Sequence, residues 1–389
     1  GDEGVRAIGA SVDITNVTLT QSQSTVTVNG QEETQYGAGN NRGIYALGAS
    51  GSINGLYAET HSGDGAVLHI IEQTSEFVIS NIHANNGISK PAIVIEDSSN
   101  FELKSSNLTG NAIHLIKSTG IISDVNMVGS TADVAIKIER TKSKEGVEIK
   151  NSQTSGYGVG LELTGINGNS PIVSNSNDWG ATNSILSSGL GFVSTGDIFL
   201  GDVSLNSTYD LVSIIYDSEQ SPTDLNATGS SSIEMWATYQ LSATIADVNQ
   251  SVDFIITVPE FGTKETSSYT GSGMSADIQL LWKYADSSGT QHANLATLTA
   301  RESGALPYSG QIGLGDNSPK TITVALLENT APLTVIQQPL DQSEHEEGYE
   351  LRLQGGGADI HTPVTLVWEL YDLQVGTTTQ YNGADVNVS

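Results

Sequence analysis

Apolar and polar residues alternate over short segments throughout the first half of the chain. Each segment is followed about ten residues later by a second one, and the pair recurs roughly every 20 to 26 residues. A period of two predicts β-strands, and the Gly, Ser and Asn residues between the segments predict turns. The clearest copies are 66–70 with 77–81, 92–95 with 101–103, 112–115 with 121–124, 135–138 with 147–151, and 159–163 with 172–175.

Strands this short cannot enclose a core alone, so each copy must stack on the next. If one copy is one coil, strands of successive coils pair in parallel at about 4.8 Å and their inward aliphatic residues form columns. This arrangement is a parallel β-helix. Weaker copies at 43–46 with 52–54, and an opening segment at 12–16, extend the pattern toward the N-terminus.

A second regularity lies four residues after the inward aliphatic residue of each second strand. We interpret these positions as a column of amide side chains at a coil corner, where they bond to the coils above and below and satisfy turn backbone. The aliphatic residues are Ile79, Leu103, Ile122, Ile149 and Val173, and the corner residues are His83, Asn107, Asn126, Gln153 and Asn177.

These motifs resemble the right-handed parallel β-helix repeat of pectin-lyase-like proteins, clearly over 43–180 and by extension over 5–218. The resemblance implies the fold but no single activity, because that superfamily includes polysaccharide lyases, hydrolases, phage tailspikes and non-catalytic surface proteins. We therefore predict an all-β chain with a β-helix over 1–218, opened by an N-terminal arm at 1–30.

The pattern changes after Tyr216. Residues 219–232 are polar, contain Pro222 and Gly229, and are predicted to be a linker. Longer strands beyond them predict an antiparallel β-sandwich over 233–389. Trp236, Trp282 and Trp368 lie in this half, two of them on alternating strands, and are interpreted as inter-sheet core residues, with a ligand platform as the alternative. The composition of this half resembles immunoglobulin-like or jelly-roll modules of prokaryotic surface proteins. The predicted strands are 233–246, 252–258, 276–284, 293–299, 321–327, 333–338, 349–353 and 365–371.

Charge and composition narrow the function classes. The chain has 44 acidic and 15 basic residues, so its formal net charge of -29 disfavours nucleic-acid binding. It contains no Cys, which excludes disulfides and thiolate chemistry. Its longest apolar runs, such as 364–368, are far shorter than the about 20 residues that span a bilayer, and no membrane span is expected.

One pair of carboxylates qualifies as a catalytic candidate. Glu102 and Glu148 point outward from second strands two coils apart, or about 9.6 Å, close to the roughly 6.5–9.5 Å of an inverting glycosidase pair. Lys104 and Lys150 follow each glutamate by two residues, so a solvated charged face explains the same residues. The Asn-Thr-Asp, Asp-Asp, Gly-His-Gly and Arg-Ile-Lys motifs of polygalacturonase-like hydrolases are absent.

Metal and modification sites are also indicated by short motifs. His69 and His114 share an outward position but lie two coils apart, which is too far for one metal ion. Acidic turns at 63–65, 315–317 and 341–347 are interpreted as solvated turns, with Ca²⁺ binding as the alternative. Sequons mark Asn16, Asn206, Asn226, Asn249 and Asn387 as glycosylation candidates, whereas Asn107 is set aside because its column is expected to point inward.

These features favour an extracellular structural protein that assembles with itself into a surface layer, sheath or filament of the kind found in archaea and bacteria. Assembly through the ends of the β-helix, or through Val12, Ile14, Val17 and Leu19 of the arm, is expected to use backbone pairing. Two alternatives stay open: a carbohydrate-active enzyme, and an adhesin that binds glycans through residues 233–389.

Overall fold

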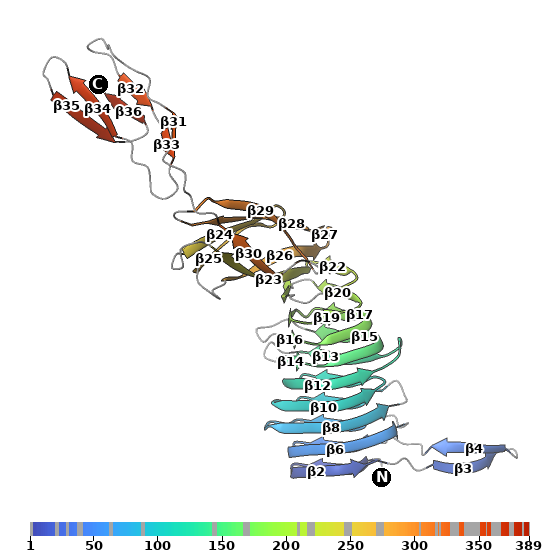
Figure 1. Cartoon of the computed structure of the whole chain (residues 1–389). Helices are drawn as coiled ribbons and strands as arrows, with labels where there is room; N and C mark the ends of the chain where they lie inside the picture. The colour runs from blue at the N-terminus through green and yellow to red at the C-terminus, as the bar shows by residue number, and fades with distance from the viewer. Residues whose placement is uncertain are drawn as a thin grey trace. The chain divides into compact units, whose positions relative to one another are not determined.

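The computed structural model describes an all-β protein (Figure 1). The chain divides into two compact units. The first unit comprises residues 1–238, 279–294 and 314–318, and the second comprises residues 239–278, 295–313 and 319–389. The described residues are 3–19, 23–28, 31–36, 42–61, 65–86, 90–141, 146–165, 172–207, 211–215, 222–244, 251–269, 276–302, 305–315, 318, 320–326, 334–337, 351–354, 356–358, 367–372, 377–382 and 385–388.

The first unit is a large all-parallel sheet that coils into a solenoid, as Figure 1 shows for the stacked rungs from β2 to β17. Its coils have three faces, and each face is a ladder of parallel strands. The first face contains β1 (Glu3–Ile8), β5 (Arg42–Leu47), β7 (Leu68–Ile71), β9 (Ile93–Glu96), β11 (Ile113–Ile116), β13 (Val134–Arg140), the later parts of β15 (Gln153–Gly165) and β17 (Asp178–Ser188), β20 (Asp202–Ser207) and β22 (Leu225–Gly229).

The second face begins each longer strand, and the third face continues it after a corner. The second face contains β2 (Ser11–Thr18), β6 (Ser50–His61), β8 (Phe77–Asn86), β10 (Phe101–Thr109), β12 (Gly120–Val128), β14 (Val147–Lys150), β16 (Ile172–Asn175), β18 (Phe192–Thr195), β21 (Leu211–Ile215) and the start of β23 (Ser232–Thr244). The third face contains the later parts of β2, β6, β8, β10 and β12, the starts of β15 and β17, and β19 (Ile198–Phe199).

The core consists of aliphatic columns inside the coils, as the alternation predicts. On the second face Ile53, Ile79, Leu103, Ile122 and Ile149 are in register, and each is 0% exposed. Full burial of one such side chain contributes about 1.5–3 kcal/mol, and every coil repeats it. The matching column on the first face is Ile44, Leu68, Ile93, Ile113, Ile136, Leu161 and Ile185.

The corner between the second and third faces is a column of left-handed backbone. Its residues have φ between 49° and 78°, a conformation that Gly and Asn adopt at low cost. One left-handed residue turns the strand sharply without ending the pairing on either side. The column is Asn16, Gly55, Asn81, Ser105, Asp124, Asn151, Ser176 and Gly196.

The residue after each of these turns points inward. At several turns its backbone N–H donates a hydrogen bond to a buried serine hydroxyl of the next coil. Ser106 Oγ accepts a hydrogen bond from the Ile82 N–H at 3.1 Å, and Ser152 Oγ accepts one from the Val125 N–H at 3.2 Å. The corner between the first and second faces uses the same device, with Ser118 Oγ accepting from the Ser98 N–H at 3.1 Å. Serine hydroxyls therefore satisfy the turn backbone at both corners.

Four of the five predicted amide-rich positions are in register from coil to coil, but they lie outside the corner. His83, Asn107, Asn126 and Gln153 are in register, yet all four side chains are exposed on the third face. The prediction that they fill a corner is wrong for these four, because the left-handed residue before them occupies one extra position and exchanges the inward and outward sides of the strand. It is correct for Asn177, which is buried at the corner, accepts from the Ser152 N–H at 2.8 Å and donates to the Ile149 carbonyl at 2.9 Å. The fifth position is Asp178, not Asn177, since Ser174 rather than Val173 continues the inward column beyond Ile149.

The ends of the solenoid differ from the predicted boundaries. Residues 3–8 and 11–18 pair in parallel with β5 and β6, so they form the first coil and not a free arm. At the other end, β22 pairs with β20 and residues 232–236 pair with β21, so the segment predicted as a linker contains strands of the solenoid. An antiparallel hairpin, β3 (Gln23–Val28) with β4 (Gln31–Tyr36), is inserted between the first two coils.

The second unit contains small antiparallel and mixed sheets. Its largest described sheet is antiparallel, in the order β25 (Gly262–Tyr269), β24 (Ser251–Val258), β28 (Leu295–Arg301) and β29 (Tyr308–Gly313). The later part of β23 pairs in parallel with β30 (Thr321–Ala325), so the expectation of purely antiparallel pairing is wrong there. Alternation of apolar residues does not encode strand direction. Three further antiparallel pairs are β31 (Thr334–Gln337) with β33 (Gly356–Ala358), β32 (Leu351–Gln354) with β36 (Asp385–Val388), and β34 (Val367–Asp372) with β35 (Thr377–Asn382).

β26 (Ala276–Asp286) runs across the division of the chain. Its part after residue 279 belongs to the first unit, where it forms an antiparallel hairpin with β27 (Gly289–His292). Trp282 in this hairpin is 3% exposed and meets His292 edge to face, with ring centroids 5.4 Å apart. Trp282 is therefore a core residue, but of this hairpin in the first unit and not of the sandwich expected over 233–389. Trp236, expected in the same core, is half-buried, and its Nε1 donates to Glu234 Oε2 at 2.8 Å. The side chain of Trp368 lies outside the described residues.

Candidate functional site

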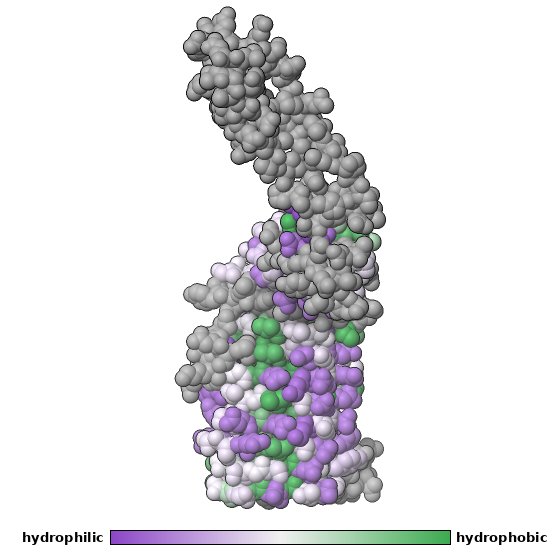
Figure 2. Space-filling view, turned by 60° about the vertical axis from the view of Figure 1, so that its left-hand side comes forward, coloured by the Kyte–Doolittle hydropathy of each residue, from purple (hydrophilic) through white to green (hydrophobic). Residues whose placement is uncertain are grey.

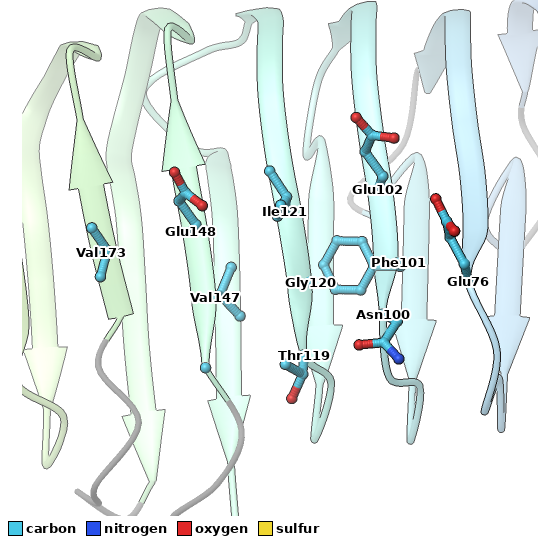
Figure 3. A pocket seen from close by; sticks show the side chains of 11 residues that line it. Glu76, Asn100, Phe101, Glu102, Thr119, Gly120, Ile121, Val147, Glu148 and Val173 are labelled. Carbon is cyan, nitrogen blue, oxygen red and sulfur yellow. The ribbon is translucent and has the colours of Figure 1, made fainter.

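The two candidate glutamates lie on one open groove of about 690 Å³ on the second face. Glu102 pairs in register with Ile121, and Ile121 with Glu148, so one coil, with the uncharged Ile121 at this position, separates the carboxylates (Figure 3). Two strand spacings correspond to about 9.6 Å between them. Lining residues are Glu76, Asn100, Phe101, Glu102, Thr119, Gly120, Ile121, Gly146, Val147, Glu148 and Val173.

Each glutamate forms an ion pair with the lysine of its own strand. Lys104 Nζ lies 2.9 Å from Glu102 Oε2, and Lys150 Nζ lies 3.6 Å from Glu148 Oε1. All four side chains are 33–40% exposed, so water screens both pairs. Both carboxylates therefore have charge partners and neither is in the desolvated setting that a catalytic acid requires.

The floor of the groove is apolar and tightly packed. The Phe101 ring lies over Gly120, as Figure 3 shows, and a Cβ added at Gly120 would stand 2.5 Å from Phe101 Cδ1. Apolar residues run along one face of the coils between hydrophilic ones in Figure 2. On the second face the half-buried Val78, Ile121 and Val173 occupy the same outward column as the two glutamates.

A second charged cluster occupies the first face. His114 Nε2 lies 3.1 Å from Glu139 Oε1, and Lys137 Nζ lies 3.2 Å from both Glu139 Oε1 and Glu162 Oε1. Burial lowers the pKa of His114 against the opposing effect of Glu139. The pKa of Glu139 is lowered because Lys137 and His114 together outweigh its partial burial. The cluster is an ion-pair network between adjacent coils.

The structure separates the two histidines as the spacing indicates. Val94 pairs in register with both His69 and His114, so one coil lies between them. His69 instead approaches Glu96, with 3.6 Å between Nε2 and Oε2. Among the described residues no cluster of three or more His, Asp or Glu side chains is placed to hold a metal ion. Of the predicted acidic turns, 341–347 lies outside the described part of the chain. Only the end residues Gly65 and Gly315 of the turns 63–65 and 315–317 are described.

Three glycosylation candidates are exposed: Asn16, Asn206 and Asn226. Asn107 is exposed as well, so the reason given for setting its sequon aside does not hold. Asn249 and the side chain of Asn387 lie outside the described residues. Among the assembly residues, Ile14 is buried, while Val12, Val17 and Leu19 are half-buried within the first coil.

A second open groove, which no sequence motif predicted, lies where β15 bulges between Ser155 and Tyr157. This groove of about 560 Å³ is lined by Thr131, Thr154, Ser155, Gly156, Tyr157, Asp178, Gly180, Ala181, Thr182 and Leu200. Burial raises the pKa of Asp178, and its Oδ1 atom is buried without a hydrogen-bond partner in the described part of the chain. The bulge has no motif of its own, although Gly156 and Gly158 mark the irregular backbone.

Comparisons with protein-family models, curated proteins and solved structures find no match for this chain. No described helix is long and apolar enough to cross a bilayer. The function must therefore be argued from the faces of the solenoid themselves.

Proposed function

We propose that the chain is an extracellular structural protein that self-assembles into a surface layer, sheath or filament. One observation carries the proposal: within the described residues, β1 and β2 of the first coil each pair on one side only, with β5 and β6. A parallel ladder that ends in this way offers backbone donors and acceptors to a strand of another subunit. Contacts between two different patches propagate, so they build filaments or lattices.

The finer fold assignment belongs to the same proposal. We take the solenoid to be a right-handed β-helix, because crossovers between parallel strands are right-handed in nearly all proteins. We take the antiparallel sheets of the second unit to form a β-sandwich, the arrangement in which two such sheets bury their apolar faces against each other. The acidic, amide-rich surface, with its net charge of -29, keeps such a protein hydrated outside the cell.

Blocking the first coil tests the proposal. A folded carrier protein fused ahead of Gly1 should abolish filaments or lattices in negative-stain electron microscopy, because it covers the edge of β1 and β2. The same carrier fused after Ser389 is the matched control and should leave assembly intact. Assembly that persists with the N-terminal carrier, or discrete particles from the unfused chain, would overturn the proposal.

The groove between Glu102 and Glu148 supports hydrolysis or lyase chemistry on an acidic polysaccharide as a second candidate. Its separation of about 9.6 Å fits an inverting pair, but both carboxylates are paired with lysines. Incubation with polygalacturonate, followed by a reducing-end assay, distinguishes the candidates. The structural proposal predicts no release; release that disappears in Glu102→Gln would replace it with an enzymatic function.

A further inference from the structure

The third face carries an exposed and mostly uncharged polar column, in which Asn126 Nδ2 donates to Asn107 Oδ1 of the adjacent coil at 3.5 Å. We define the amide column as Thr18, Tyr57, His83, Asn107, Asn126, Gln153 and Asp178, which pair in register from coil to coil. All of them except Asp178, which is half-buried, are exposed. The five steps from Tyr57 to Asp178 span about 24 Å.

The chemistry of this column differs from that of the other two faces. The first and second faces carry glutamates paired with lysines, whereas the amide column has no Lys, Arg, Asp or Glu between Thr18 and Gln153. The adjacent left-handed corner is also mostly uncharged, with Asn81, Ser105 and Asn151 beside the single carboxylate Asp124. Two columns of amides and hydroxyls therefore lie side by side in a chain of net charge -29.

An aromatic platform occupies one end of the column. The rings of Tyr57 and His83 are stacked, with centroids 4.8 Å apart and planes 9° apart. Tyr57 is 40% exposed, although an aromatic ring of this size usually lies in a core. At the other end the column reaches the groove lined by Thr131, Ser155 and Thr182. Leu200 in this groove is 53% exposed, and Asp178 Oδ1 is buried without a hydrogen-bond partner among the described residues.

We propose that the amide column and this groove bind an uncharged polysaccharide chain laid along the solenoid. Each amide both donates and accepts hydrogen bonds, as sugar hydroxyls do, and the Tyr57–His83 stack, in which the two ring faces cover each other, presents its exposed ring edges to the ligand. In the groove, the exposed hydroxyls of Thr131, Ser155 and Thr182 offer donors and acceptors to further sugar hydroxyls. This site differs from the glycan-binding region expected in residues 233–389 and does not depend on self-assembly.

The charge of the chain selects this ligand over others. A polyanion would be repelled by the net charge of -29, and a metal or cationic ligand would favour carboxylates over neutral amides. An uncharged ligand experiences neither effect. Many weak hydrogen bonds at the coil spacing can then add up along one extended chain.

Affinity electrophoresis tests the proposal with the full chain, produced without glycosylation so that Asn107 is unmodified. The protein is run in native gels containing dextran, mannan or laminarin, with polygalacturonate as the charged comparison. At least one neutral polysaccharide should retard it. Tyr57→Ala and Asn126→Ala should each weaken binding roughly tenfold, the loss of one central contact.

Matched controls separate binding from folding. Tyr308→Ala and Asn226→Ala remove an exposed tyrosine and an exposed asparagine away from the amide column and should leave retardation unchanged. Thermal unfolding of all four variants confirms that they are folded. The proposal is overturned if no neutral polysaccharide retards the protein, if polygalacturonate does so instead, or if both column variants bind like the controls.

Discussion

At the scale of single residues, the interior of the solenoid contains a polar network around Asp197 in place of aliphatic packing. Asp197 is 0% exposed and accepts hydrogen bonds from the Asn177 N–H at 2.7 Å and from Ser194 Oγ at 2.5 Å. Trp179 Nε1 and Asn177 Nδ2 both donate to Ser174 Oγ, at 3.2 and 3.0 Å. These bonds satisfy buried groups, but burial still raises the pKa of Asp197 despite them.

Two substitutions at Asp197 should have different effects. A pKa that is raised by folding favours the protonated form in the native state, so stability falls as pH rises from the unfolded-state value through the folded-state value. Asp197→Asn keeps an acceptor for the Asn177 N–H and removes the buried charge. We expect it to gain stability relative to the native chain between about pH 4 and pH 7.5, measured by urea unfolding at both values.

Asp197→Ala is the contrasting variant, since it leaves the Asn177 N–H and the Ser194 hydroxyl without their acceptor. It should be about 1–3 kcal/mol less stable than Asp197→Asn at either pH, because neither variant has a carboxyl that titrates at this position. Equal stabilities for the Asn and Ala variants would show that the network contributes nothing. A pH-independent difference between the Asn variant and the native chain would show that Asp197 does not titrate as its burial implies.

At the scale of the strands, the alternation of apolar residues predicted the inward columns correctly, but it did not predict where the strands turn. The inward columns at Ile79, Leu103, Ile122 and Ile149 were correct because burial requires an apolar residue at every coil. The direction of the amide column was wrong because a single left-handed residue such as Asn81 or Asp124 reverses parity without breaking the strand. Asparagine at 81 and 151, just after the second-strand motifs, was the available signal for that turn.

The role of the inward serines and the strands of the second unit were harder to predict from the sequence. Inward Ser106 and Ser152 interrupt the apolar pattern, and only the three-dimensional register reveals that their hydroxyls pair with the backbone of a neighbouring coil. Several strands of the second unit, including β25 and β29, are rich in Ser, Thr and Gly and lack clear alternation. The candidate glutamates were placed correctly because their spacing depends only on strand register.

The corner serines should contribute more to the free energy of unfolding than their small size suggests. Ser152 is 1% exposed, accepts from the Val125 N–H at 3.2 Å and donates to the Lys150 carbonyl at 3.0 Å. Ser152→Ala leaves a buried N–H unpaired and should lower the free energy of unfolding by about 1–3 kcal/mol. Ser155→Ala, at an exposed position on the same strand region, should change it by less than about 0.5 kcal/mol in the same urea titration.

A result in which both serine variants unfold alike would mean that water or local movement replaces the corner bond. The comparison also reports on cooperativity between coils, because Ser152 itself donates its N–H to Asn177 Oδ1 at 2.8 Å. Three consecutive coils are thereby joined through side chains as well as through strand pairing. The stabilisation of one corner therefore depends on its neighbours, as in other repeat folds.

At the scale of the whole molecule, charge opposes the assembly that the open first coil allows. The 44 acidic and 15 basic residues give each subunit a formal charge of -29, and approaching subunits repel one another. Many basic residues on the solenoid are already paired with carboxylates, such as Lys104, Lys137 and Lys150. Among the described residues of the solenoid, few cations are left to attract a second subunit, so screening by salt must reduce the repulsion.

Assembly should therefore increase with ionic strength. Raising NaCl from about 10 mM to 100 mM shortens the Debye length from about 30 Å to 10 Å, which removes most of the repulsion between exposed charges. Light scattering should rise over this range, and CaCl₂ or MgCl₂ at equal ionic strength should act at least as well and similarly to each other. Backbone pairing at the first coil is not weakened by salt. Loss of scattering with added NaCl would instead mean that ion pairs hold the subunits together, and a response to CaCl₂ far larger than to MgCl₂ would indicate a specific Ca²⁺ site.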